Sequence, residues 1–307
     1  MNHPDVRVLG VPGTEGDIRK ITSQDLLREG KIESGELSLV VGCPPCQGYS
    51  LQGKRRVTDE RNALYKEFVR LVGELRPRMT VFENVPGILN FQSGKIIADL
   101  QERVQSLGYA TVTWILNASD LGIPQMRKRV FVIGTIGNHL PSMPPLENST
   151  LGVWNAIRDL PSSKLCGDNF GCRMIPYRSP PSSTYASLLR GNKRKVGNCE
   201  IGNHSPGWLK RIHSLKWGER DESTWQSRLH PWKAAPTLTA GTRTRTACRP
   251  IHPFADRVLT VREGARLSSF PDWYAFPKEK AEAWSQIGNC VPPLMAQKIL
   301  ERVKNCI

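Results

Sequence analysis

The chain has 307 residues, with 43 lysines and arginines against 28 aspartates and glutamates, and so carries a formal net charge of +15. A positive excess of this size indicates a polyanionic partner, most often nucleic acid, because Lys and Arg side chains neutralise phosphates. No apolar run approaches the roughly 20 residues of a membrane span, and the eight cysteines are irregularly spaced, which excludes membrane-embedded and disulfide-framework proteins. We therefore expect a cytoplasmic protein with one sizeable core and a smaller lobe.

A glycine-rich segment lies near the N-terminus, where Gly10, Gly13 and Gly16 are followed by Asp17. This spacing is a weak indication of a phosphate cradle, because no convincing helix begins at the last glycine. Asp17 alone is typical of a cap or turn residue before a short helix over residues 23–27.

The stretch GCPPCQGYS at residues 42–50 follows an apolar, β-branched run at residues 37–41, which predicts a buried strand. A Gly and two prolines end the strand and hold Cys46 on a rigid loop at its carboxyl end, where open α/β sheets place reactive groups. Cysteine is often a small buried apolar residue, but the polar and glycine neighbours here argue against a core position. Two interpretations remain: a nucleophilic Cys46, or a thiol redox pair formed by Cys43 and Cys46.

Residues 62–76 carry apolar side chains at helical intervals and predict a helix packed on the sheet. A strand over residues 80–84 follows and places Glu83 at the same carboxyl edge as the cysteine loop. An unpaired buried carboxylate is costly, so Glu83 is a better candidate for a functional residue than for a surface acid.

A basic stripe precedes the next predicted strand, residues 130–134, and follows a predicted helix over residues 94–107 and a strand over 110–116. Gln125, Arg127 and Arg129 alternate along it, and side chains of an extended segment have period two, so the three are expected on one side. Such a stripe is usually a solvated face.

From residue 142 to about 247 the chain is rich in Pro, Ser, Asn, Gly, Lys and Arg, and only residues 154–160 and 208–215 predict short helices. Its basic side chains suit phosphates or guanine edges, although each taken singly is more typical of a phosphate contact or a solvated charge. They are Arg190, Lys193, Arg194, Lys195, Arg243, Arg245 and Arg249. The cysteines of this interval lack C-x-x-C spacing, which argues against a zinc site.

These segments resemble, in order, the motifs of the DNA (cytosine-5)-methyltransferase family. The cysteine loop is similar to that family's nucleophile loop, and four further segments match: GDI at 16–18, ENV at 83–85, QMRKR at 125–129 and GNCVPP at 288–293. A thiol redox pair explains none of these four. A proline at the first turn suits the final helix, predicted to run through residue 303.

The resemblance implies an α/β fold: a Rossmann-like sheet of the S-adenosylmethionine-dependent methyltransferases, N-terminally incomplete, with a small irregular target recognition domain. The implied domains are a first catalytic part at residues 1–141, the target recognition domain at 142–250 and a return to the catalytic domain at 251–307.

The implied reaction transfers a methyl group from S-adenosylmethionine to carbon 5 of a flipped cytosine in double-stranded DNA, through a covalent Cys46 adduct. The expected catalytic residues are Cys46, Glu83, Arg127 and Arg129; the cofactor-binding residues are Asp17, Ile18, Pro45, Asn289 and Val291; the substrate-binding residues are Gln47, Ser50, Asn84 and Gln125; no metal is expected.

The sequence departs from the family at its start, since only 15 residues precede Gly16 and they contain no Phe-x-Gly-x-Gly cofactor loop. We therefore expect a bacterial or phage modification methyltransferase, associated with the nucleoid, whose missing cofactor motif is supplied by an upstream segment or a separate polypeptide. The alternative is an inactive or partner-dependent DNA-binding fragment of such an enzyme.

Overall fold

The computed structural model describes residue 2 and residues 16–45, 63–137, 139–147, 151–164, 174–240 and 250–306. The chain forms two compact units. The first, here called the loop-rich unit, consists of Met1–Asn2, Asn117–Arg127 and Pro145–Lys298; the second, the sheet unit, consists of His3–Leu116, Lys128–Pro144 and Ile299–Ile307. The functional division predicted from the sequence stays a prediction, because packing contacts do not report what each part does.

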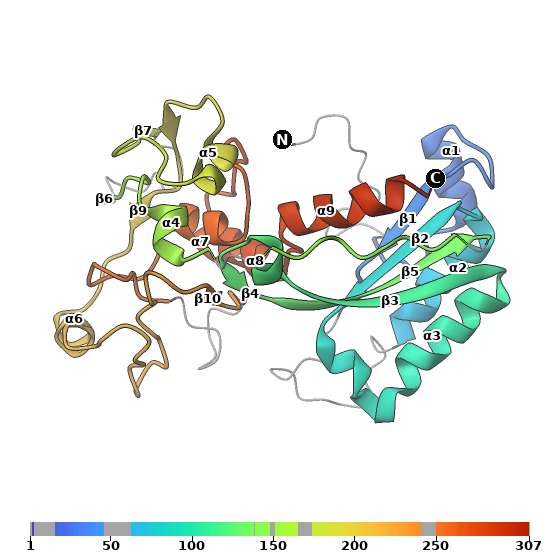
Figure 1. The fold of residues 1–307 in the computed structure, drawn as a ribbon, viewed down its shortest axis with the longest axis horizontal. Coiled ribbons are helices and arrows are strands. Elements are labelled where there is room, and N and C mark those ends of the chain that lie inside the picture. Colours follow the sequence, from blue (N-terminus) through green and yellow to red (C-terminus); the bar gives the residue numbers. More distant parts are fainter. Residues whose placement is uncertain are drawn as a thin grey trace. The chain divides into compact units, whose positions relative to one another are not determined.

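The sheet unit is built on a four-stranded sheet in the order β1-β2-β5-β3 within the described residues (Figure 1). Strand β1 (Leu39–Gly42) runs parallel to β2 (Met79–Asn84), and β2 runs antiparallel to β5 (Lys128–Ile136). Strand β3 (Tyr109–Asn117) lies next to β5. All six residues of β2 are buried, as expected for a central strand covered on both faces.

Helices α2 (Leu64–Leu75) and α3 (Lys95–Ser106) pack against the sheet through their apolar stripes. Phe68 of α2 contacts Phe82 of β2, with ring centroids 5.5 Å apart. The amphipathic spacing of both helices therefore predicts their buried faces correctly. The 62–76 and 94–107 predictions are confirmed to within two residues.

The position before Cys43 has no room for a side chain. A Cβ added at Gly42 would lie 2.3 Å from Cδ2 of Phe68, far inside van der Waals contact. Gly42 thus lets α2 approach the end of β1 closely.

Helix α1 (Ser23–Gly30) begins at a capping box. The Thr22 hydroxyl accepts a hydrogen bond from the Asp25 amide, and the Asp25 carboxylate accepts one from the Thr22 amide. Thr22 rather than Asp17 therefore caps this helix, whereas the expected turn role of Asp17 is confirmed, because its Oδ1 accepts a hydrogen bond from the Arg19 amide at 3.1 Å.

The loop-rich unit contains short helices and two-residue strands around a separate apolar core. Two of the helices, α4 and α6, confirm the predictions near residues 154 and 208, whereas α5, α7 and α8 were not predicted because they are short or lack a clear apolar stripe. The helices are α4 (Val153–Ile157), α5 (Thr184–Arg190), α6 (Pro206–His213), α7 (Val261–Leu267) and α8 (Lys280–Asn289), and α9 (Pro293–Lys304) begins here. The short strands are β4 (Gln125–Met126), β6 (Ser163–Lys164), β7 (Ile175–Pro176), β8 (Lys195–Val196), β9 (Glu200–Ile201) and β10 (Ala235–Pro236), and a 3-10 turn covers Ala118–Leu121. Two further 3-10 turns, Pro86–Leu89 and Phe91–Gly94, belong to the sheet unit. No helix in the described ranges is long and apolar enough to cross a membrane.

Charged side chains are part of this unit's core. The Arg266 guanidinium is completely buried and pairs with Asp159 (3.2 Å) and Asp272 (2.6 Å), which are also buried. Arg257 pairs with buried Glu263 at 2.7 Å. Buried charges persist only when they are paired and hydrogen-bonded, so these networks fix how the short elements meet.

His252 lies beside the Arg257–Glu263 pair and accepts a hydrogen bond from the Phe254 amide through Nδ1. Burial lowers the pKa of His252 to about 4, although Glu263 opposes the shift. Burial raises the pKa of Glu263, but the Arg257 guanidinium outweighs it and brings that pKa down to about 2. His252 is therefore neutral in the folded protein at neutral pH.

We predict that the protein loses stability as the pH falls from 6.5 towards 4. In that range the unfolded chain takes up a proton on His252 that the folded chain does not, which favours unfolding. Between pH 7 and pH 5 the loss attributable to His252 should be about 2 kcal/mol. Urea unfolding at both pH values should show a smaller loss for His252→Asn, which keeps an acceptor but does not titrate; an equal loss in both proteins would contradict the prediction.

Candidate active site

Glu83 and Cys43 lie at the same edge of the sheet. The parallel register pairs Gly42 of β1 with Phe82 of β2, so Cys43, just past the end of β1, lies beside Glu83, the penultimate residue of β2. Carboxyl ends of parallel strands are where α/β folds place their ligands and reactive groups.

Arg129 of β5 completes this edge within the sheet unit. Its Nε donates to Oε1 of Glu83 at 2.9 Å, and each side chain is only 12% exposed. Glu83 is thus a charge-compensated, largely buried carboxylate in a fixed orientation. The sequence predicted both residues as part of one site, and the structure brings them together.

The Cys43 thiol is held neutral. The residue keeps exposed surface, but desolvation of the thiol, the negative charge of Glu83 and a hydrogen bond to Glu83 raise its pKa to about 12, with Arg129 acting in the opposite direction. A thiolate is the attacking species in both nucleophilic and disulfide chemistry. The structure therefore disfavours Cys43 as a redox thiol, and this contact with Glu83 is one that the sequence did not indicate.

The predicted loop residues Cys46, Gln47 and Ser50 lie outside the described residues. The chain that leads to them is anchored by Asn84, which is 1% exposed. Its amide Nδ2 donates to the Pro44 carbonyl at 3.3 Å, and its Oδ1 accepts from the Val85 amide. Asn84, predicted to bind substrate, thus ties the start of the cysteine loop to the end of β2.

Gln125 and Arg127 are both completely buried in the loop-rich unit, so they are not part of a solvated face. Gln125 Nε2 donates to the Leu267 carbonyl and to Ser268 Oγ. The Arg127 guanidinium donates to the carbonyls of Leu238 (2.9 Å) and Gly288 (2.6 Å). These contacts hold the backbone, and the substrate and catalytic roles expected for the two side chains stay predictions.

Asp17 is an ionised hydrogen-bond acceptor. Hydrogen bonds from the Arg19 side chain and amide lower its pKa to about 2, and Nη2 of Arg19 lies 2.6 Å from its carboxylate. The turn is fixed because Arg70 Nη2 donates to the Ile18 carbonyl at 3.1 Å. The sequence did not single out Arg19, although its separation from Asp17 by two residues is typical of such local pairs.

The other predicted cofactor residues are available for contact. Pro45 is exposed at the end of the described cysteine loop. Asn289 is exposed and is the last residue of α8, where its Nδ2 donates to Ser285 Oγ, and Val291 is half-buried. Asp17, Ile18 and Pro45 belong to the sheet unit, and Asn289 and Val291 to the loop-rich unit.

Comparison with known proteins identifies relatives along almost the whole chain. Residues 8–305 match the family model of the C-5 cytosine-specific DNA methylases. The type II methyltransferase M.XorII of Xanthomonas oryzae pv. oryzae is 35% identical over 301 residues, which cover 91% of this chain and 70% of the relative. M.DdeI of Desulfomicrobium norvegicum is 33% identical over 342 residues, which cover 98% of this chain and 79% of the relative.

Solved structures show the same architecture. A prophage-encoded E. coli protein described as a DNA modification methyltransferase superposes with a TM-score of 0.79 at 29% identity, covering 94% of this chain and 84% of that one. The Dnmt2 methyltransferase of S. pombe shares the fold at a TM-score of 0.57 and 15% identity, covering 94% and 82%. The predicted α/β methyltransferase fold is confirmed, and the chain belongs to the C-5 cytosine-specific DNA methylase family.

Proposed function

We propose that this protein methylates carbon 5 of cytosine in double-stranded DNA, with S-adenosylmethionine as methyl donor and Cys46 as covalent nucleophile. The Glu83–Arg129 pair carries the proposal, because it fixes a carboxylate at the strand edge from which the cysteine loop leaves. The family match makes the alternative of an inactive fragment less favoured. Since the relatives are named type II methyltransferases, we place the protein in a restriction-modification system.

The chemistry requires an enzyme nucleophile because carbon 5 of cytosine is itself too poor a nucleophile to attack the methyl group. Addition of the Cys46 thiolate to carbon 6 forms an S–C bond and moves the ring's π electrons towards carbon 5 and nitrogen 3. Glu83 acts here in its protonated form: it donates its proton to nitrogen 3, which neutralises the negative charge that develops there, and takes the proton back once carbon 5 has been methylated. After carbon 5 has been methylated, loss of its proton and breakage of the S–C bond release the product and the free thiolate.

The predicted cofactor residues fit S-adenosylmethionine by their chemistry. The ionised Asp17 carboxylate, with its orientation set by Arg19, suits the amino group of adenine, and the exposed Asn289 amide supplies donors and acceptors. Ile18, Pro45 and Val291 would provide apolar contact. When bound, the cofactor supplies an electrophilic methyl group on a sulfonium.

DNA binding is supported by the net charge of +15 and by exposed cations of the loop-rich unit. Lys193, Arg194 and Lys195 are consecutive and exposed, so they are free to meet phosphates. Arg190 differs, since it donates to the Ser179 carbonyl and its guanidinium lies 3.7 Å from the centre of the Tyr177 ring. Its contacts favour a structural role over the predicted DNA contact.

Cys46→Ser should abolish catalysis, to below about one thousandth of the original rate, since a hydroxyl is a far weaker nucleophile. Tritiated methyl transfer to DNA and covalent trapping on 5-fluorocytosine DNA measure this directly. Cys43→Ser is the matched control and should retain both activities, because its thiol is protonated. Equal loss in the two variants, together with a reversible Cys43–Cys46 disulfide, would support the redox interpretation instead.

Glu83→Gln should lower kcat by about 10²- to 10⁴-fold, the usual contribution of a positioned acid or base. Asp99→Asn removes a carboxylate that pairs with Arg103 on the surface of the same unit, and it should leave methyl transfer unchanged. Thermal unfolding of both variants separates a chemical effect from a loss of fold. An active, folded Glu83→Gln protein would remove Glu83 from the mechanism.

Binding to duplex DNA should weaken steeply as salt rises, because each neutralised phosphate releases a counterion. Replacing Lys193, Arg194 and Lys195 together by Ala should reduce the slope of log K against log salt by about 2 to 3. Fluorescence anisotropy with a labelled duplex at several salt concentrations gives both slopes. Identical slopes would show that these cations do not contact phosphates.

A further inference from the structure

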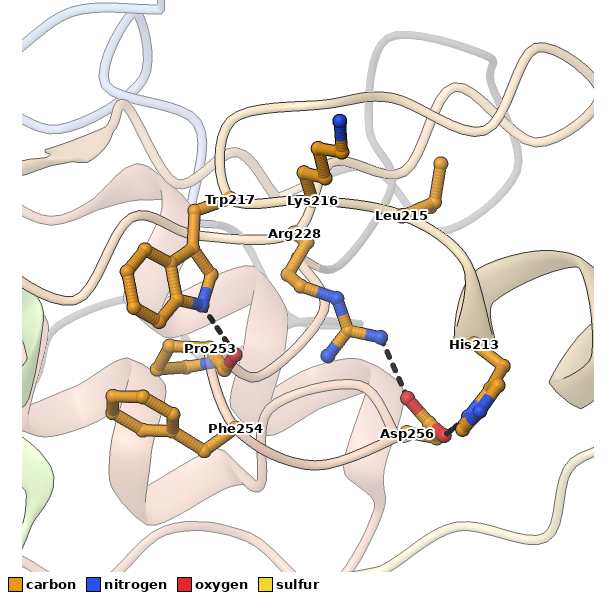
Figure 2. A pocket seen from close by; sticks show the side chains of 8 residues that line it. All are labelled: His213, Leu215, Lys216, Trp217, Arg228, Pro253, Phe254 and Asp256. Carbon is orange, nitrogen blue, oxygen red and sulfur yellow. Dashed lines mark hydrogen bonds and ion pairs between the residues drawn. The ribbon is translucent and has the colours of Figure 1, made fainter.

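A cavity of about 540 Å³ opens within the loop-rich unit, at a place that none of the catalytic or cofactor residues reaches. The last residue of α6, His213, borders it together with the following residues Lys216 and Trp217, and Arg228 and Phe254 come from later segments (Figure 2). The volume falls within the range of small-ligand sites. It is sufficient for one nucleotide.

Two aromatic rings form a corner of this cavity. Trp217 is 45% exposed and Phe254 48% exposed, and the rings lie edge to face with centroids 5.5 Å apart. Trp154 packs behind Phe254 at 4.7 Å, and His230 lies 5.6 Å from Trp217. A planar ring that enters can stack on one face and contact the other edge-on.

The corner is held rigidly before any ligand arrives. Trp217 Nε1 donates to the Pro253 carbonyl at 3.0 Å, which joins the two aromatic segments (Figure 2). The Arg228 guanidinium donates to the carbonyls of Ile212 and His252 and pairs with Asp256 at 2.6 Å. Preorganised walls of this kind spare the ordering cost of binding.

Basic side chains border the aromatic corner. Lys216 and His213 are exposed at the cavity, and Asp256 is already engaged by Arg228 and by His213 Nδ1 at 2.7 Å. Arg228 is 6% exposed, and its Nε is a buried donor with no hydrogen-bond partner among the described residues.

We propose that this cavity binds one unstacked nucleotide of the DNA, other than the target cytosine, with its base on the Trp217–Phe254 corner and its phosphate near Lys216. The proposal rests on the proposed function, since it takes the substrate to be DNA. Aromatic faces stack on any base, while the exposed Lys216 cation suits a phosphate. A proline-rich peptide also uses aromatic grooves, but the net charge of +15 and the exposed Lys216 at the cavity favour an anionic ligand.

The test uses the full chain and two fluorescein-labelled 20-base-pair duplexes that differ by one unpaired central adenine. The wild-type protein should bind the duplex with the unpaired adenine more tightly. Trp217→Ala should weaken binding to that duplex by about 5- to 100-fold and remove the preference. Trp217→Phe keeps an aromatic ring and should retain most of the affinity and the preference. Lys216→Ala should keep the preference and lower the salt slope by about 0.7 to 0.9.

Two controls locate the effect. Trp273→Ala removes a tryptophan of similar exposure (50%) in the same unit and should leave the preference intact. Cys46→Ala should also retain it, which separates this cavity from the methylation site. The proposal would be overturned if Trp217→Ala and Trp273→Ala had equal effects, or if Cys46→Ala lost the preference. It would also be overturned if a proline-rich peptide bound in a way that depends on Trp217 and excludes the duplex.

Methyl transfer to plasmid DNA is measured in parallel to keep the two proposals distinct. A wild-type protein that shows the adenine preference but transfers no methyl group would contradict the proposed function and leave the cavity assignment standing. A protein that transfers methyl groups but shows no adenine preference that depends on Trp217 would contradict the cavity assignment and leave the proposed function standing.

Discussion

The close approach of Phe68 to Gly42 is the constraint on which the candidate active site depends. With no side chain at residue 42, helix α2 presses against the end of β1, and β1 keeps its parallel register with β2. That register sets Cys43 next to Glu83, and β5 then brings Arg129 to the same carboxylate. A larger residue at position 42 would displace α2 or the end of β1, and would thereby change the position of Cys43 relative to Glu83.

The two units are stabilised differently. The sheet unit relies on apolar helix faces and a central strand with six buried residues. The loop-rich unit has short elements, and it adds buried ion pairs such as Arg266 with Asp159 and Asp272 to its apolar core. Such pairs are directional and poorly tolerant of loss, so they specify one arrangement of loops where periodic packing does not.

Long periodic segments were predictable from the sequence because their burial pattern is local. The α2 and α3 stripes and the β2 run each encode their own packing, and Glu83 was identified from the cost of burying a carboxylate. The period-two stripe of Gln125 and Arg127 indicated side-chain direction but not destination, since their partners, the carbonyls of residues 238, 267 and 288, are more than a hundred positions away.

The cavity was not predictable for the same reason. Its two aromatic segments are joined by the hydrogen bond that Trp217 Nε1 donates to the Pro253 carbonyl, and no sequence pattern at either residue predicts that contact. Likewise the Cys43 contact with Glu83 depends on strand register, which the sequence suggested only in outline.

The bonds of Arg127 have a consequence for how this chain can vary. One guanidinium holds the carbonyls of Leu238 and Gly288, and a Cβ at Gly288 would lie 2.0 Å from the amide nitrogen of Ala240. Arg127 thus joins the backbone at 238–240 to the end of α8, which carries Asn289. Lysine could not replace it, because its ammonium group lacks the rigid planar fork of donors that reaches both carbonyls. Substitutions at residues 127 and 288 should show strong epistasis, so drift at one position is constrained by the residue at the other.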